Sequence, residues 1–362
     1  MITDCASQCN GFSFLCGRKY DDVAYLTTHN AFNNSADGFM LPNQNNTITQ
    51  QLNDGVRAFM IDVYNKDGVA TVYHGFSYLG SKPLTYNLVE IKSFLDNNPN
   101  EIVTIIFECH TTSGLIETAL TETGLMNFLF VKDALTEWPT LQEMINMGKR
   151  LVIFSEADNA IPGQDWYHYI WEHAVETDFS FSDSSQFSCD FNRGDSINEL
   201  FILNHFITNS ITGTGMPDEA AIVNASPYLI NRLTACMIEK NKFPNFIAVD
   251  FYETGNCKDA VDSLNRQYWS GNDEYESKHP DVNVWPNPGN GVINIDFEND
   301  SEFDNGDIKI FNQLGREVYR KSIRSKEMII NISGVCSRGL YFLQLRDKQQ
   351  NVVLVKKIIF AP

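Results

Sequence analysis

Short apolar runs alternate with helix-like patterns through the first 270 residues of the chain. Runs such as IVTIIF and LVIF are continuously apolar, which is typical of strands buried on both faces of a sheet. Helical patterns follow or precede them, as in TITQQLNDG, LVEIKSFLDNNP and the stretch from Leu115 to Gly148. The alternation predicts an α/β fold in which helices wrap a parallel sheet. Its expected strands are VAYLTTHN, RAFMIDVY, ATVYHG, EIVTIIFECH, RLVIFSEA, ELFILNHFI and NFIAVDFY.

Long polar segments interrupt this alternation. Residues 33–46 are rich in asparagine and residues 178–196 in serine and aspartate, and both are expected to be long surface loops, either functional or disordered. In WYHYIWEHAVE (166–176) the aromatic residues have helical spacing, which predicts core packing or a loop that acts as a lid.

The pattern changes near residue 272. A polar, proline-containing stretch predicts a linker at 273–282. Beyond it, short alternating segments and turns predict a small all-β sandwich over 283–362. The expected organisation is therefore a large α/β barrel over 1–272, the linker, and the sandwich.

Charge and hydropathy narrow the classes of partner. The formal net charge is −19, and residues 1–280 hold 16 Lys and Arg against 36 Asp and Glu. Such an acidic surface disfavours binding to nucleic acid or to an anionic bilayer. No apolar run approaches the roughly 20 residues that a membrane span needs, so no transmembrane segment is expected.

The eight cysteines indicate an exported protein. No paired CxxC motifs supply a zinc site, and disulfides fit better, with Cys9–Cys16 and Cys189–Cys236 as the favoured pairs. The opening MITDCASQC shows no secretory signal, which indicates that a signal was removed or that the start is truncated.

Acid, amide and imidazole side chains follow the predicted strands at their carboxyl ends, where an α/β barrel holds its catalytic groups. They are His29, Asn30, Asp62, His74, Glu108, Glu156 and Asp250. Two imidazoles can serve as the base and the acid of phosphodiester cleavage, with Asp250 orienting a ring nitrogen. The oxygen groups of Asn30, Asp62 and Glu108 suit Ca²⁺ or Mg²⁺ better than zinc.

Residues 9–270 resemble the phosphatidylinositol-specific phospholipase C X-domain superfamily, whose members are TIM-barrel phosphodiesterases. The motifs are the THN of His29, DGVRAFMIDVY, YHG, NPNEIVTIIFE and GKRLVIFSE. CNGFSFLCGRKYDDVAYLTTHNAF, SCDFNRG and PNFIAVDFY resemble secreted bacterial and fungal members. The resemblance implies a phospholipid or other phosphodiester substrate.

The same resemblance places the two catalytic histidines on His29 and His74, and the calcium ligands on Asn30, Asp62 and Glu108. Calcium-dependent members have a second acid where this chain has Met60, and metal-independent relatives have an arginine where it has Tyr64. Ca²⁺ is therefore the expected cofactor, at a weakened site.

The C-terminal segments VWPNPGNG, IKIFNQLGREVYR, GLYFLQLRD and VVLVKKIIF resemble the type IX secretion sorting domain of Bacteroidetes. That resemblance implies the type IX secretion machinery as a partner, and a secreted or cell-surface location.

Several of the candidate residues could instead have a purely structural role. Asp62 and Glu108 could pair with Arg57 or a lysine, and Arg193, Lys149 and Arg150 could contact phosphate or simply cap the backbone. The remaining histidines are interpreted as structural: His110, His168, His173, His205 and His279. A glycerophosphodiesterase or sphingomyelinase-type activity, or a catalytically weak surface binding module, is the alternative function.

Overall fold

The chain forms two compact units, residues Met1–Leu264 and Asn265–Pro362. The computed structural model describes residues 8–133, 136–210, 213–272, 282–286, 289, 291–297, 306–312, 317–334, 339–346 and 352–360. The division between the units falls inside helix α7 (Cys257–Asn272). The linker expected at 273–282 lies outside the described residues except for Val282, which begins strand β12 (Val282–Trp285).

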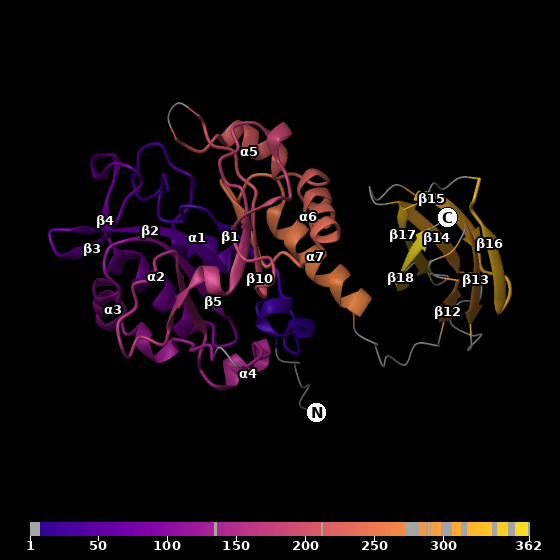
Figure 1. Ribbon diagram of the computed structural model, residues 1–362, viewed down its shortest axis with the longest axis horizontal. Helices are drawn as coiled ribbons and strands as arrows, with labels where there is room; N and C mark the ends of the chain where they lie inside the picture. Colours follow the sequence, from indigo (N-terminus) through magenta and orange to yellow (C-terminus); the bar gives the residue numbers. More distant parts are fainter. Residues whose placement is uncertain are drawn as a thin grey trace. The chain divides into compact units, whose positions relative to one another are not determined.

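The first unit is built on a parallel sheet that curves into a barrel (Figure 1). Its strands pair in the order β7-β6-β5-β2-β1-β11-β10-β8, and every pair is parallel. Within the described residues β7 and β8 do not pair, so the barrel is open between them. The parallel strands are β1 Tyr25–Thr28, β2 Ala58–Lys66, β5 Val103–His110, β6 Leu151–Ser155, β7 Tyr167–Tyr169, β8 Ala174–Thr177, β10 Leu200–Asn204 and β11 Phe246–Val249.

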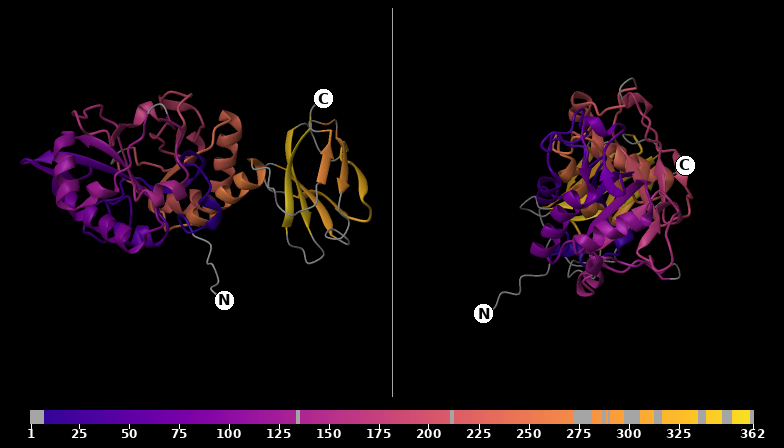
Figure 2. Two further views of the ribbon diagram at one scale, coloured as in Figure 1. Left: turned by 90° about the horizontal axis from the view of Figure 1, so that it is seen from below. Right: turned by 90° about the vertical axis from the view of Figure 1, so that its left-hand side faces the viewer.

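Helices lie around the outside of these strands (Figures 1 and 2). They are α1 Ile48–Asn53, α2 Leu84–Asn97, α3 Ser113–Glu122, α4 Leu141–Asn146, α5 Pro217–Val223, α6 Tyr228–Lys240 and α7. Three antiparallel strands extend the sheet: β3 Val69–Val72, β4 Lys82–Pro83 and β9 Phe191–Gly194. The arrangement confirms the α/β barrel-type fold.

Burial along the strands explains why the apolar runs identified them. All residues of β6, β10 and β11 are buried, as two-face burial requires. In β5 the burial ends after Phe107, and Glu108 is exposed. The strands therefore change from core to solvent at the point where the candidate polar residues occur.

Of the two roles expected for residues 166–176, core packing is confirmed, although the segment is not a helix. This segment forms β7, a short 3₁₀ turn (Ile170–Glu172) and β8. Its two histidines pack against core aromatics: His173 lies edge-on to Trp138, and Phe154 lies near both His168 and His173. The helical spacing of the aromatics does not produce a helix here. Each strand is too short for its sequence to show an alternating pattern.

Both favoured disulfides are present. Cys9–Cys16 closes the segment before β1, and Cys189–Cys236 ties the 178–196 loop to α6. Of the described cysteines, Cys109 and Cys257 are free thiols.

Two core histidines are held in the neutral form. His168 donates from Nδ1 to the Ile153 carbonyl (2.8 Å) and accepts at Nε2 from the Lys132 amide (3.0 Å). His205 donates from Nε2 to the Val223 carbonyl (3.0 Å) and accepts at Nδ1 from Arg232 (3.0 Å). Burial lowers the pKa of His168 from 6.5 to about 4 and that of His205 from 6.5 to about 3.

These two histidines should make the fold sensitive to acid. Because the unfolded chain protonates them near pH 6.5 and the folded chain does not, the free energy of unfolding falls as the pH drops from about 6.5 towards 4. We expect a loss of about 2 to 5 kcal/mol by pH 4.5, read from guanidinium unfolding. The non-titrating variant His168→Gln should lose less between pH 7 and 4.5 than the wild type. An equal loss would contradict this assignment.

The second unit is a small sandwich of two antiparallel sheets, shown as two layers in Figure 2. One sheet has the order β12-β13-β16 and the other β15-β14-β17-β18. A shared core of apolar side chains, including Ile295, Ile310 and Leu343, lies between them. The strands are β12 Val282–Trp285, β13 Val292–Phe297, β14 Asp307–Asn312, β15 Glu317–Ser322, β16 Glu327–Asn331, β17 Gly339–Arg346 and β18 Val352–Phe360. The predicted all-β sandwich is confirmed.

Candidate active site

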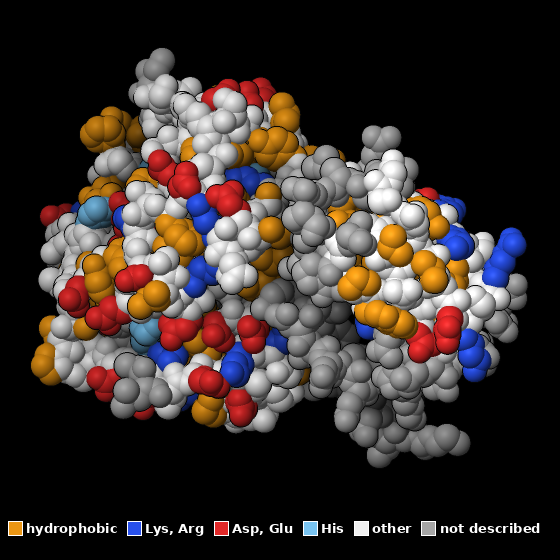
Figure 3. All heavy atoms as spheres, turned by 45° about the vertical axis from the view of Figure 1, so that its right-hand side comes forward, with side chains coloured by type: hydrophobic (Ala, Val, Ile, Leu, Met, Phe, Trp, Pro, Cys, Tyr) orange, Lys and Arg blue, Asp and Glu red, His pale blue; other side chains and the backbone are white. Residues whose placement is uncertain are grey.

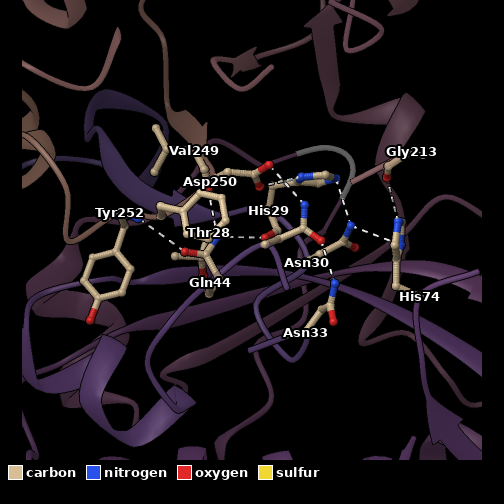
Figure 4. A network of polar contacts seen from close by, with 12 residues as sticks. Thr28, His29, Asn30, Asn33, Gln44, His74, Gly213, Val249, Asp250 and Tyr252 are labelled. Atoms are coloured by element: carbon tan, nitrogen blue, oxygen red, sulfur yellow. Dashed lines mark hydrogen bonds and ion pairs between the residues drawn. The ribbon is translucent and has the colours of Figure 1, made fainter. Parts of the chain in front are cut away.

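His29 and Asp250 are brought together by two neighbouring strands. Thr28 ends β1 and is in register with Val249, which ends β11. The next residue of each strand is therefore a neighbour of the other, and His29 Nδ1 lies 2.9 Å from Asp250 Oδ1 (Figure 4). Nδ1–H donates to the buried carboxylate, which leaves Nε2 of His29 as the acceptor.

The His29–Asp250 pair is fixed on both sides. The His29 ring stacks on Phe206, with the ring centres 3.8 Å apart and the planes 5° from parallel. Asn43 donates to the second oxygen of Asp250 (3.0 Å), and Asn33 donates to Asn43 (2.8 Å). The Asn-rich loop 33–46 therefore holds the carboxylate that orients His29, which gives this predicted loop a role at the site.

A β-hairpin brings His74 beside Asp62. After β2 the chain reverses at Asp67 and Gly68, both at positive φ (53° and 80°), a conformation that glycine adopts at little cost. β3 then runs back along β2, with Val72 opposite Val63. His74 Nδ1 lies 3.1 Å from Asp62 Oδ2 as a result.

His74 faces two hydrogen-bond acceptors. Nδ1 contacts the Asp62 carboxylate, and Nε2 lies 3.3 Å from the Gly213 carbonyl (Figure 4). A ring that donates from both nitrogens is an imidazolium, and the hydrogen bond to Asp62 raises the pKa of His74. The two histidines also share a neighbour, because Asn30 Nδ2 lies 3.2 Å from His29 Nε2 and 3.2 Å from His74 Nδ1.

The expected metal ligands Asp62 and Glu108 lie opposite each other on neighbouring strands. Burial raises the pKa of Asp62, and the negative charge of the neighbouring Glu108 raises it further. Their oxygens match a hard cation in type. Each carboxylate is paired with a histidine, Asp62 with His74 and Glu108 with His110 (2.8 Å). Within the described residues, no group of three or more His, Cys, Asp or Glu side chains is arranged to hold a metal ion.

A cavity of about 380 Å³ opens at this end of the barrel. Arg193 from β9 reaches into it and binds Glu156 with both terminal nitrogens (2.7 and 3.1 Å) and Glu176 with Nε. Burial raises the pKa of Glu156 to about 7. The residues that line the cavity are His29, Met60, Asp62, Ile106, Glu108, Cys109, His110, Glu156, Ala157, Glu176, Phe179, Arg193, Asn204 and Phe206.

The structure gathers the sequence-predicted site residues at this end of the barrel. Four of them line the cavity: His29, Asp62, Glu108 and Glu156. His74 lies beside the cavity lining, in contact with Asp62 and Asn30, and its side chain is 33% exposed. Arg57, which was considered as an ion-pair partner of Asp62 or Glu108, pairs with Glu101 instead (2.7 Å).

The other candidate cations cap the backbone. Arg150 donates to the carbonyls of Leu95, Asn98 and Glu101, and Lys149 to that of Asn127. Neither lines the cavity.

The sequence interpretation missed four residues at the site. Asn204 ends β10, a strand that the sequence did predict, so the strand-end rule applied to it and was not used. Glu176 is the residue before the end of β8, a strand that was not recognised. Asn43 and Gly213 come from loops, where no periodicity marks a residue.

Comparison with known proteins identifies the family of the barrel unit. Residues 15–265 match the family model described as PI-PLC X 1. The chain belongs to the PI-PLC X family.

Curated relatives align with about 70% of the chain. A PI-PLC X domain-containing protein of Arabidopsis thaliana is 30% identical over 282 residues, and the alignment covers 64% of that protein. An uncharacterized secreted protein of Arthroderma benhamiae is 28% identical, with 62% of its length covered. PI-PLC X domain-containing protein 1 of the same fungus is 29% identical, with 89% covered. The chain thus spans less than two thirds of the first two relatives.

Solved structures include variants of the phosphatidylinositol-specific phospholipase C of Staphylococcus aureus. One of them is 16% identical, covers 68% of this chain and 93% of its own, and has a TM-score of 0.49.

The sandwich unit has its own match. Residues 283–361 fit the model of a secretion system C-terminal sorting domain. This PI-PLC X protein is accordingly an exported one, secreted or attached to the cell surface. Of the helices in the described residues, none is both long enough and apolar enough to cross a membrane.

Proposed function

We propose that this PI-PLC X protein is a phosphoric diester hydrolase or lyase of the phospholipase C type, acting on a phosphoinositide or a related phosphodiester. The observation that supports this most strongly is the pair of differently partnered histidines. His29 keeps an acceptor nitrogen while His74 faces two acceptors, and both rings meet at Asn30. A base and an acid side by side are what displacement at a phosphodiester requires.

In the proposed reaction, a hydroxyl of the head group attacks the phosphorus atom. His29 Nε2 takes the hydroxyl proton, and Asp250 holds the ring in the required tautomer. His74 gives a proton to the leaving alkoxide of the lipid, and the hydrogen bond to Asp62 keeps that proton on the ring until then. Attack from within the head group yields a cyclic phosphate and releases diacylglycerol or a related lipid.

We further propose that Ca²⁺ binds weakly through Asn30, Asp62 and Glu108. When bound, it would polarise a phosphoryl oxygen and favour ionisation of the attacking hydroxyl. The paired positions of Asp62 and Glu108 support this proposal. Met60, which also faces the cavity, supplies no ligand.

The partner of the sorting domain is proposed to be the type IX secretion machinery, from the match at residues 283–361. The glycerophosphodiesterase or sphingomyelinase alternative calls for a stronger acidic metal cluster, and Met60 weighs against it.

An added acid at position 60 should strengthen the metal site. Met60 precedes Asp62 by two residues in β2, so its side chain points to the same face of the strand. Met60→Glu is expected to lower the Kd for Ca²⁺ by about tenfold or more, and Glu108→Gln to raise it, both measured by isothermal titration calorimetry without substrate. Val89→Glu adds a carboxylate on an exposed part of α2 and serves as the matched control. Unchanged affinity in Met60→Glu and Glu108→Gln would show that the ligand set is wrong.

A further inference from the structure

Helix α6 fastens the segment that leads to Arg193. Residues 178–190, here called the β8–β9 connection, join β8 to β9, and Arg193 lies in β9. Four side chains of α6, spaced by four residues and so following one another along one side of the helix, contact this connection. The contacts are Tyr228 with the Ser184 carbonyl (3.3 Å), Arg232 with the Ser188 carbonyl (3.0 Å), Cys236 with Cys189 as a disulfide, and Lys240 with the Asp190 carboxylate (2.8 Å).

From these contacts we infer that the Cys189–Cys236 disulfide is a redox switch for the cavity. With the two cysteines as thiols, Arg193 is displaced and the site binds an anionic phosphodiester weakly. Closing the disulfide joins the two sulfurs and passes two electrons and two protons to an external disulfide, which is released as two thiols. Since an exported chain is made where thiols stay reduced, the switch keeps the site weak until export. This inference rests on the proposed phosphodiesterase function.

The noncovalent contacts of the β8–β9 connection are weak or few. The contacts of Tyr228 and Lys240 with it are solvent-exposed, and exposed contacts of this kind contribute little. Arg232 is 9% exposed, and its guanidinium lies over the half-buried ring of Phe187 (4.1 Å). Phe181, which is 5% exposed, packs against Phe187 as well.

The disulfide constrains the connection far more strongly. It links positions 47 residues apart, and a crosslink across a long loop removes much of the freedom of the open chain. The sequence SFSDSSQFSCD (180–190) is mostly serine and aspartate, with little apolar surface to hold it in place. Reduction therefore releases the β8–β9 connection.

The position of Arg193 depends on this connection. β9 has four residues, lies at the edge of the sheet and pairs with β8 in an irregular register. From β9 the guanidinium reaches Glu156 (2.7 and 3.1 Å) and Glu176. A short edge strand whose leading segment is released holds this geometry poorly, so Arg193 is displaced when the disulfide opens.

Displacement of Arg193 changes the charge of the cavity. Arg193 is the single Lys or Arg among the described residues that line it, and four carboxylates line it too: Asp62, Glu108, Glu156 and Glu176. Without the cation the cavity is more negative and repels a phosphodiester, which carries a negative charge. The effect should appear in KM more than in kcat, because the two histidines proposed to catalyse the reaction are held by β1, β11 and the β2–β3 hairpin.

Kinetics of the purified full chain in its oxidised and reduced forms test this inference. Initial rates on phosphatidylinositol vesicles are measured before and after treatment with dithiothreitol, which becomes a cyclic disulfide as it reduces the protein. We expect reduction to raise KM by about tenfold or more and to change kcat by less than about threefold. The double variant Cys189→Ser/Cys236→Ser should behave in the same way without reductant. High salt should shrink the rise in KM, because it screens the repulsion.

Cys9→Ser/Cys16→Ser is the matched control. Both disulfides join a buried cysteine to a half-buried one, but Cys9–Cys16 closes the segment before β1, away from the cavity lining. This variant should keep the KM of the oxidised wild type, with thermal unfolding confirming that it is folded.

Arg193→Gln separates the switch from a general loss of structure, because it keeps the disulfide. It should raise KM in the oxidised protein to a similar degree. Reduction of this variant should then raise KM by less than about twofold further, since both changes act through the same cation. Fully additive effects, or an unchanged KM in the reduced wild type and in Cys189→Ser/Cys236→Ser, would overturn the inference.

Hydrogen exchange, read by mass spectrometry on the same preparations, reports on the connection without turnover. Reduction should speed amide exchange across residues 184–194 by at least about tenfold and leave β1 unchanged. Faster exchange with no cleavage in either form would defeat the proposed function and leave the redox-dependent anchoring of Arg193 standing. Cleavage with equal KM in both forms would overturn the switch and leave the proposed function standing.

Discussion

His29→Ala is expected to lower kcat on phosphatidylinositol vesicles by about 10²- to 10⁴-fold, the usual contribution of a positioned general base. The reason is that the Nδ1–H bond to Asp250 leaves His29 Nε2 as the unprotonated, acceptor nitrogen of the ring. Asp250→Asn should also lower kcat. An amide at that position can donate to Nδ1 and so favour the tautomer in which Nε2 carries the proton. The measurement is initial-rate release of diacylglycerol.

His173→Gln provides the control for loss of an imidazole. His173 is half-buried beside the core residues Trp138 and Phe154 and does not line the cavity. This variant should keep close to wild-type kcat, with thermal unfolding confirming that all three variants are folded. Normal turnover by folded His29→Ala would remove His29 from the role of base.

His74→Ala is expected to show a loss that depends on the leaving group. A lipid alkoxide is strongly basic and needs a proton, so kcat on phosphatidylinositol should fall by about 10²- to 10⁴-fold. A nitrophenolate leaves without protonation. On a nitrophenyl phosphodiester of inositol, the same variant should lose less than about tenfold.

His29→Ala is the internal comparison for this experiment, because attack requires a base whichever group leaves. It should reduce turnover of both substrates to a similar degree. Equal losses on both substrates in His74→Ala would contradict the assignment of His74 as the acid and would favour a purely positioning role for the Asp62–His74 pair.

The parts of the fold with strong periodic signals were predictable from the sequence. Buried parallel strands read as unbroken apolar runs, so β5, β6, β10 and β11 stand out. β7 and β8 have 3 and 4 residues and are separated by a short 3₁₀ turn, which leaves too little sequence for any period to emerge. The helical spacing of their aromatic residues did not indicate these strands.

The candidate site was predictable only where it lies at strand ends. His29 and Asp250 follow paired strands, and a barrel brings such positions together. The ion pairs of Arg193 with Glu156 and Glu176 could not be predicted from the sequence, because they depend on the pairing of β8 with β9 and on the curvature of the sheet. The acidity read from composition is visible on the barrel unit in Figure 3, where acidic side chains are spread across the face shown.

The most direct test of the central claim is to identify the product formed from phosphatidylinositol vesicles by the purified chain, with Ca²⁺ and with chelator, using mass spectrometry. The two-histidine mechanism predicts a cyclic inositol phosphate together with diacylglycerol, and neither product from His29→Ala. Absence of any cleaved phosphodiester from the folded wild-type protein, under both conditions, would contradict it.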